Sequence, residues 1–133
     1  MKSNDPYNEA LRYIENAEDI LKSAGKEGRY YTDDKYVKIA CGTAYSGILV
    51  ALDALFDIKN LPKRRGRKAI DYYQSNLAII DKKLLKELNN AYTVLHLDGY
   101  YGGITSVKTI ESGFDDATSI IAALKPYSNN GAE

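Results

Sequence analysis

The sequence predicts an all-α fold, an antiparallel bundle of about five helices in a single domain, and three observations support this. Apolar residues recur at three- and four-residue steps along most of the 133-residue chain, which is the spacing of one helix face. No segment alternates between apolar and polar residues for long enough to indicate a sheet. Glycine and proline separate the periodic segments, so connections should be short and neighbouring helices antiparallel.

The first expected helix begins beside Asp5, a suitable N-cap. Pro6 suits the first helical position, where its missing N–H has no intrahelical partner to lose. The apolar stripe of this helix consists of Tyr7, Leu11, Ile14, Ala17, Leu21 and Ala24. Gly25 and Gly28 mark its end, and residues 29–31 are expected to form a turn-rich linker.

The second expected helix opens at Thr32 and is the central helix of the bundle. From Val37 to Phe56 it is apolar nearly all round, so other helices must surround it. Cys41 on this helix is interpreted as a packing residue rather than a nucleophile. Small residues would allow neighbouring helices to approach closely: Gly42, Ala44, Gly47 and Ala51.

The third and fourth helices are expected to meet at Asp81, which is a good cap for the fourth. The third carries Ile70, Tyr73, Leu77 and Ile80, and the fourth carries Leu84, Leu88, Ala91 and Leu95. Gly99 is expected to end the fourth helix in the left-handed C-terminal conformation.

A fifth helix is expected after a cap at Thr105 or Ser106, and Pro126 is expected to stop it. The ordered core is then about 6–126. The polar tail 128–133 is expected to be flexible.

The overall composition excludes several classes of function. Lysine plus arginine total 18 and aspartate plus glutamate total 18, which argues against a whole-surface nucleic-acid binder. A single cysteine gives neither an internal disulfide nor a set of zinc thiolates, and no metal-ligand spacing or cofactor motif is present. We therefore expect no metal and no cofactor. The start of the chain lacks a secretory signal, so we expect a reducing, cytoplasmic location and no membrane association.

One loop concentrates positive charge in five of six consecutive residues: Lys63, Arg64, Arg65, Arg67 and Lys68. We call this segment the basic loop. It is the candidate binding site for phosphate or nucleic acid, because clustered cations attract phosphate groups. The simpler alternative is a solvated loop whose cations pair with Asp57 or Asp71, and contact with a protein partner is a third.

His96 is the only histidine, so imidazole acid–base chemistry near neutral pH depends on it. Asn89 and Tyr92 lie about two turns and one turn earlier. Together with Asp53, a lone charge on the central helix, they form the candidate catalytic set. Asp53 is expected to face solvent, or to hydrogen-bond a tyrosine or His96. His96 near a helix C-terminus is expected to have a raised pKa, and a purely structural role remains its alternative.

Twelve tyrosines stand out in the composition, and six of them occur as adjacent pairs: Tyr30–Tyr31, Tyr72–Tyr73 and Tyr100–Tyr101. Adjacent helical residues diverge by about 100°, so one ring of each pair is expected to point inward and the other outward. Tyrosine also suits interfaces, because its ring is apolar and its hydroxyl is polar. We therefore expect some tyrosines at a homodimer contact.

Two segments resemble the HEPN (higher eukaryotes and prokaryotes nucleotide-binding) superfamily of helical bundles. Residues 40–55 (ACGTAYSGILVALDAL) resemble its central helix, which is rich in small residues. Residues 92–101 (YTVLHLDGYY) resemble its later helix, which ends in a histidine and a Gly-Tyr tip. In layout the resemblance covers residues 7–125. The chain also resembles a small family of bacterial proteins that form a domain of unknown function.

The resemblance implies a role for His96, but an arginine that accompanies this histidine in the superfamily is missing here. Ribonucleases of the superfamily carry an arginine four to six residues before the histidine, where it binds phosphate. Asn90, Ala91 and Tyr92 stand in or near that window here, and no arginine does. An asparagine keeps polarity without the charge that stabilises a phosphate.

The leading hypothesis is therefore a non-catalytic, homodimeric HEPN-like interaction or binding module. The alternative is a metal-independent ribonuclease or nucleotide-binding protein that uses His96 and the basic loop. The resemblance also implies a nucleotidyltransferase-type protein as a partner.

Overall fold

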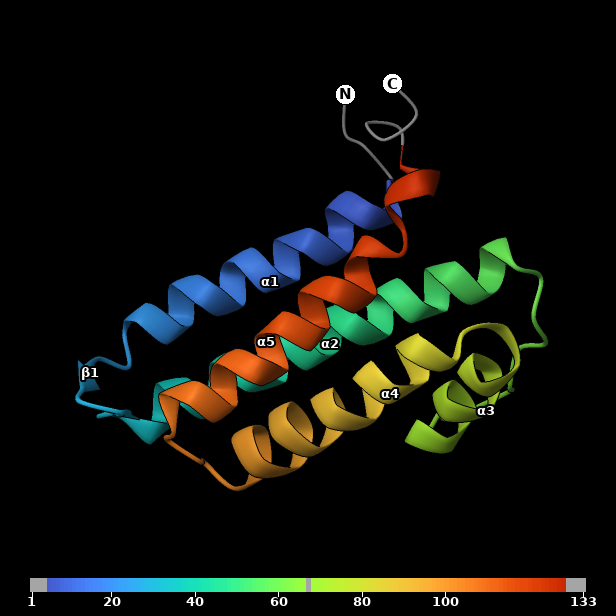
Figure 1. Cartoon of the computed structure of the whole chain (residues 1–133). Coiled ribbons are helices and arrows are strands. Elements are labelled where there is room, and N and C mark those ends of the chain that lie inside the picture. The colour runs from blue at the N-terminus through green and yellow to red at the C-terminus, as the bar shows by residue number, and fades with distance from the viewer. Residues whose placement is uncertain (1–4, 67, 129–133) are drawn as a thin grey trace.

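The computed structural model describes residues 5–66 and 68–128, and these residues confirm the all-α prediction. The helices are α1 (Pro6–Lys22), α2 (Asp34–Ile58), α3 (Ile70–Ile80), α4 (Lys82–Ala91) and α5 (Val107–Ala122). A π-helix, η1 (Tyr92–Tyr101), continues α4, and a 3-10 turn, η2 (Lys125–Tyr127), follows α5. Strands β1 (Lys26–Glu27) and β2 (Tyr30–Tyr31) pair as an antiparallel hairpin. In Figure 1 the long helices lie side by side, with the hairpin at one end of the bundle and α3 at the other.

Capping side chains fix where the helices begin. Asp5, Asp81 and Ser106 each accept a hydrogen bond from a backbone N–H group in the first turn of α1, α4 and α5, respectively. The start of α2 differs from the expectation, because Asp33 rather than Thr32 is its N-cap. The Thr32 hydroxyl instead donates to a backbone carbonyl just after the end of α1.

The linker after α1 is more ordered than expected. It contains the hairpin, and the hairpin is tied to the start of α5, because Val107 N donates to Arg29 O at 3.0 Å and Tyr31 N donates to Thr105 O at 2.9 Å. Strands of two residues are too short for alternation to reveal them. Tyr30 is 58% exposed and Tyr31 is 5% exposed, so this pair points outward and inward as predicted.

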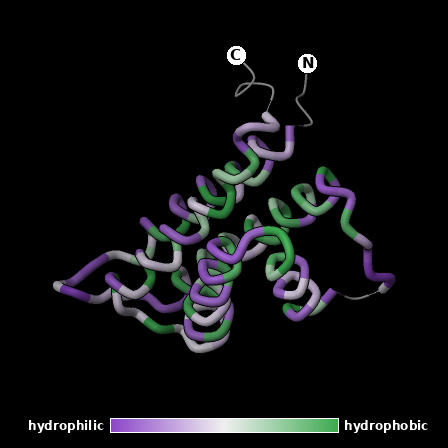
Figure 2. Tube along the Cα trace, turned by 45° about the vertical axis from the view of Figure 1, so that its right-hand side comes forward, coloured by the Kyte–Doolittle hydropathy of each residue, from purple (hydrophilic) through white to green (hydrophobic). Residues whose placement is uncertain are grey.

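Helix α2 lies at the centre, as predicted, packed against α1, α5 and η1. Small residues allow the close crossings: a Cβ atom at Gly47 would lie 2.7 Å from Cβ of Tyr13 on α1. Among the described helices, α2 alone has the length and the apolar composition that crossing a membrane requires. Within that apolar window 56% is buried in the bundle, so contacts with neighbouring helices account for much of its apolar character. In Figure 2 the hairpin and the loop between α2 and α3 are largely hydrophilic.

One predicted helix end is wrong. The fourth helix does not stop at Gly99 in a left-handed conformation; it continues as η1 to Tyr101, and Gly103 has the positive φ of +66°. Gly99 stays helical because it is buried against α2. Helix α5 ends at Ala122, four residues before Pro126, which agrees with the expected stop because proline has no N–H to donate to the Ala122 carbonyl.

The prediction that residues 128–133 form a flexible tail is wrong for Ser128. Ser128 is 2% exposed, and its hydroxyl donates to the Asp5 carboxylate at the start of α1. This contact links the two ends of the described chain, which lie together in Figure 1. Residues 129–133 lie outside the described residues.

Candidate functional site

The π-helix η1 gathers His96 and three tyrosines. Hydrogen bonds of a π-helix close over five residues, so residues four and five apart lie above one another. The His96 ring stacks on Tyr92 and Tyr100, with ring centroids 5.3 Å and 6.1 Å away, and Tyr101 meets it edge-on at 5.0 Å. Because π-helical turns are rare and frequently occur at functional sites, η1 marks the first candidate site.

Helix α2 supplies a fourth aromatic ring. Tyr45 is 8% exposed and stacks on His96, with 4.7 Å between the ring centroids. Burial, with a smaller contribution from Tyr92, raises the pKa of Tyr45 well above its ordinary value. The Tyr45 phenol therefore keeps its proton and acts as an apolar wall for the imidazole.

Two glycines allow η1 to approach α2 this closely. A Cβ atom at Gly99 would lie 2.5 Å from Cys41 Sγ, and one at Gly42 would lie 2.7 Å from the Tyr100 ring. Real Cβ atoms essentially never lie this close to another atom, so a side chain at either position would force Cys41 or Tyr100 to shift. Cys41 is fully buried and burial raises its pKa to about 12, which agrees with packing rather than nucleophilic chemistry.

A groove of about 490 Å³ opens on this side of the molecule. Helix α2 and η1 line it with the residues Ile39, Gly42, Thr43, Tyr45, Ser46, Leu49, His96 and Tyr100. We call these residues, together with the adjacent Tyr101, the π-helix face. Ile39 is 47% exposed, Tyr100 45% and Tyr101 66%, so large apolar surfaces meet solvent here. Among the described residues, no Lys, Arg, Asp or Glu lines the groove.

The predicted pKa shift of His96 is wrong in direction. Burial lowers the pKa of His96 below its ordinary value. The imidazole lies between aromatic rings in the middle of η1, not at an exposed helix end where the dipole would favour its cation. It is therefore neutral near pH 7, so the π-helix face has no charged group at that pH.

Two predicted partners of His96 lie elsewhere. Asn89 accepts a hydrogen bond from Gln74 at 2.8 Å and joins α4 to α3. Asp53 accepts hydrogen bonds from the Tyr73 hydroxyl at 3.1 Å and from Lys68 Nζ at 3.3 Å. The tyrosine bond to Asp53 matches one of the alternatives, whereas the shared pocket with His96 does not form. Tyr92 is the predicted member that does contact His96.

In the basic loop three of the predicted cations are paired with carboxylates. Lys63 contacts Asp57 at 3.0 Å, and Lys68 contacts Asp53. Arg64 donates two hydrogen bonds to Asp71, at 3.1 Å and 3.0 Å. This is the pairing that the solvated-loop alternative describes. Arg65 is exposed, and Arg67 lies outside the described residues.

Two tyrosine pairs depart from the expected inward and outward arrangement. Tyr72 and Tyr73 are 6% and 4% exposed, because both pack against Phe56 at the end of α2. Tyr100 and Tyr101 are both exposed, because the adjacent groove is open. A tyrosine pair therefore reports its tertiary surroundings as well as helix geometry.

Besides Tyr45 and Gly42, four residues of the site were missed: Ile39, Thr43, Ser46 and Leu49. They recur at three- and four-residue steps on α2 and carry no charge, so they form a second stripe beside the buried one. That uncharged stripe was a usable signal. Among the described residues, no group of three or more His, Cys, Asp or Glu side chains could hold a metal ion.

The comparisons with known proteins give a family without an assigned activity. A solved structure of a protein of unknown function from Dyadobacter fermentans is 43% identical, with a TM-score of 0.84, and the match covers 93% of this chain and 97% of that chain. No curated protein matches the chain. The family model described as "Domain of unknown function (DUF5618)" matches residues 5–125, and the chain therefore belongs to this family.

Proposed function

We propose that this protein is a HEPN-like, non-catalytic interaction module and that it forms a homodimer through the π-helix face. The observation that carries the proposal is the uncharged groove bordered by the exposed rings of Tyr100 and Tyr101. Depletion of charge and enrichment of tyrosine are the features of an interface core. A contiguous exposed apolar surface of this kind is also typical of interaction sites.

The absence of charge favours a protein partner over a nucleic acid. Binding to nucleic acid depends on cations that neutralise phosphates. Within the described lining of the groove the one ionisable group besides Tyr45 and Tyr100 is His96, and burial lowers its pKa. Three cations of the basic loop are already paired with carboxylates. The groove therefore offers no cation to a phosphate, and three of the four described cations of the basic loop are compensated.

A second copy of the chain is the partner that fits best. A two-fold contact places one patch against itself, so the patch must complement its own shape and charge. The π-helix face has both large exposed rings, at Tyr100 and Tyr101, and small residues in the groove, at Gly42, Thr43 and Ser46. Two uncharged patches meet without like-charge repulsion.

Two observations support the absence of catalysis. The arginine of the superfamily's ribonucleases is missing before His96. Asp53 and Asn89, which would assist proton transfer, are engaged with Tyr73, Lys68 and Gln74 instead. His96 therefore has stacked tyrosines as neighbours rather than a carboxylate that would orient it as a general base.

Sedimentation velocity at micromolar concentrations tests the dimer. The wild-type chain should sediment as a dimer, and Ser46→Arg should shift it to monomer, because an arginine in the groove places like charges against each other. Ser75→Arg, on an exposed position of α3, is the matched control and should remain dimeric. A monomeric wild-type protein, or equal behaviour of the two variants, would refute the interface.

The alternative function is a metal-independent ribonuclease or nucleotide-binding protein centred on His96. One observation favours it: exposed Tyr100 lies parallel to the imidazole, and aromatic rings of this kind stack on unpaired bases. Structured RNAs incubated with the protein and a chelator should stay intact if the module is non-catalytic. Cleavage that disappears in His96→Ala would establish the alternative.

We also propose a location and a second partner for the protein. We place it in the cytoplasm, where a buried thiol such as Cys41 stays reduced. A nucleotidyltransferase-type protein is the second partner that the HEPN resemblance implies. Co-expression with such a protein, followed by size-exclusion chromatography, should give a joint peak that Ser46→Arg alters if the π-helix face is shared.

A further inference from the structure

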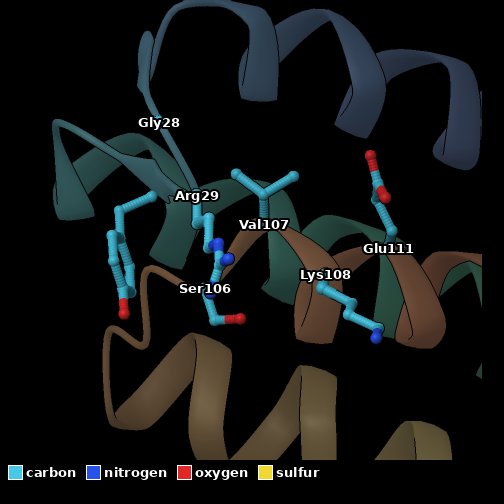
Figure 3. Close-up of a pocket in the computed structure, with 7 residues that line it drawn as sticks. Gly28, Arg29, Ser106, Val107, Lys108 and Glu111 are labelled. Carbon is cyan, nitrogen blue, oxygen red and sulfur yellow. The ribbon is translucent and has the colours of Figure 1, made fainter.

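We propose that the hairpin end of the bundle contains a second binding site, which takes a small dipolar ligand carrying one oxyanion and one ammonium group. The site is a cavity of about 620 Å³ between the hairpin and the first turns of α5. It is lined by Gly28, Arg29, Tyr30, Ser106, Val107, Lys108 and Glu111 (Figure 3). None of these residues belongs to the π-helix face, so this inference does not depend on the proposed function.

The walls of the cavity are held at a fixed separation. Val107 N donates to Arg29 O, and Tyr30 forms an isolated β-bridge with Ser106. The hairpin therefore cannot move away from α5 without breaking backbone hydrogen bonds. Because the walls are already in place, the protein loses less conformational entropy when a ligand binds.

Two cations line the cavity, Arg29 on the hairpin and Lys108 on α5, and both lack carboxylate partners among the described residues. No ion pair within 4.0 Å joins Arg29 or Lys108 to an acid, although Glu111 lies one turn beyond Lys108. In Figure 3 Lys108 and Glu111 extend in opposite directions. This differs from the basic loop, where Lys63, Arg64 and Lys68 are all paired.

The positive character of the cavity comes mainly from these two side chains, because N–H groups at the start of α5 are already used. The Val107 N–H is used by Arg29 O, and the Thr109 N–H donates to Ser106 Oγ at 3.3 Å. The oxyanion is therefore expected between Arg29 and Lys108, where charge-assisted hydrogen bonds are available.

The charge reverses at Glu111. This residue also lines an adjoining cavity of about 330 Å³, whose other acidic members are Glu18 and Asp115. Figure 3 shows the Glu111 side chain extending toward α1, away from Lys108. A ligand with only negative charge would meet repulsion at this end, whereas an ammonium group would be attracted. The arrangement of opposite charges therefore selects a dipolar ligand over a simple anion.

The spacing limits the size of the ligand. Lys108 and Glu111 are three residues apart, which is about 4.5 Å along a helix axis. Their opposite orientations widen the separation of the charged groups. A ligand whose charges are separated by a few methylene groups should therefore bind better than glycine, in which they are adjacent.

An NMR titration with simple probes tests the site. The ¹⁵N-labelled protein is titrated with glycine, 4-aminobutyrate and 6-aminohexanoate, and separately with acetate and with butylamine. We expect saturable shifts of the Gly28, Ser106 and Lys108 amide signals with one of the longer zwitterions. Acetate and butylamine, which each fill half of the site, should bind roughly tenfold more weakly.

Variants test which residues bind the oxyanion and which bind the ammonium group of the ligand. The Arg29→Gln, Lys108→Gln double variant should weaken the best zwitterion roughly tenfold or more, and Glu111→Gln should weaken it while leaving acetate binding intact. Lys82→Gln, Lys86→Gln on exposed positions of α4 is the charge-matched control and should bind like wild type. The site is refuted if no zwitterion gives saturable shifts or if the double variant binds normally. Equal binding of acetate and zwitterion would overturn the dipolar assignment.

Discussion

Two regions of the molecule differ in the surface that they offer to a ligand. One is the π-helix face, and the other is the α3 end of the bundle, which comprises the basic loop and α3. Charge is dense at the α3 end, but three of its described cations contact Asp53, Asp57 and Asp71. The groove of the π-helix face is lined by no charged residue of the described chain, yet its surface is open and η1 has a rare helix geometry. The contrast teaches that charge concentrated in a sequence does not by itself indicate charge available to a ligand.

Packing explains the contrast better than electrostatics. At the α3 end, Phe56 contacts the rings of Tyr72 and Tyr73, and Arg64 lies over Tyr72 at 5.5 Å. Aromatic burial therefore anchors α3, and the ion pairs lie outside it. At the π-helix face the tyrosines surround His96 and remain partly exposed, so their apolar surface is still available for a partner.

The largest expected effect tests whether aromatic packing holds the α3 end. Phe56→Ala should lower the free energy of unfolding by about 3–5 kcal/mol, because it leaves a cavity between α2 and α3. Ile79→Ala is the control, because Ile79 on α3 is 75% exposed and its truncation should cost about 0.5 kcal/mol or less. Urea unfolding followed by circular dichroism measures both. Similar losses in the two variants would contradict this account.

The next effect tests the close crossing beneath the π-helix face. Gly99→Ala should cost about 1–3 kcal/mol, because the added methyl group would lie 2.5 Å from Cys41 Sγ. In a Cys41→Gly background the same substitution should cost less, since the obstructing atoms are gone. Equilibrium unfolding of the four proteins in this double-mutant cycle measures the coupling. Additive losses would show that the Gly99–Cys41 contact does not determine the crossing.

Local features of the fold could be predicted from sequence, because neighbouring residues determine them. The caps at Asp5 and Asp81 and the buried central helix depend on short-range hydrogen bonding and on apolar periodicity. The π-helix could not be predicted in this way. It is accompanied by the approach of Gly99 to Cys41, which are far apart in sequence.

The same limit applies to the candidate site: contacts between residues near in sequence could be predicted, and contacts between distant residues could not. His96 and Tyr92 share one helix, so their contact followed from spacing alone. Asp53 lies eight residues beyond Tyr45, about 12 Å along the helix axis, so it could not reach the same imidazole that Tyr45 contacts. The pairing of the basic loop with Asp57 and Asp71 followed from nearness in the chain.

A smaller effect concerns the pH dependence that His96 contributes. Burial lowers its pKa in the folded state, so below about pH 6.5, the ordinary pKa, the unfolded chain binds more protons than the folded chain. Stability should therefore fall as the pH decreases through this range, and His96→Gln should remove that part of the decrease. Urea unfolding of both proteins at pH 5 and pH 8 measures it. Carboxylates such as Asp116 contribute equally to the pH dependence of the wild type and of His96→Gln, so their contribution cancels when the two proteins are compared.

The smallest effect returns to the ion pairs of the α3 end. Arg64 and Asp71 are joined by two hydrogen bonds, which raise the pKa of Arg64 and lower that of Asp71, but both groups face solvent. Arg64→Gln should therefore change the unfolding midpoint only slightly. Asp71→Asn should behave alike, and the double variant should show little further loss. The small difference from wild type should vanish near 1 M salt, where the screening length is about 3 Å. A loss comparable to that of Phe56→Ala, persisting in salt, would mean that charge rather than aromatic packing holds α3, and the contrast between the two regions would then fail.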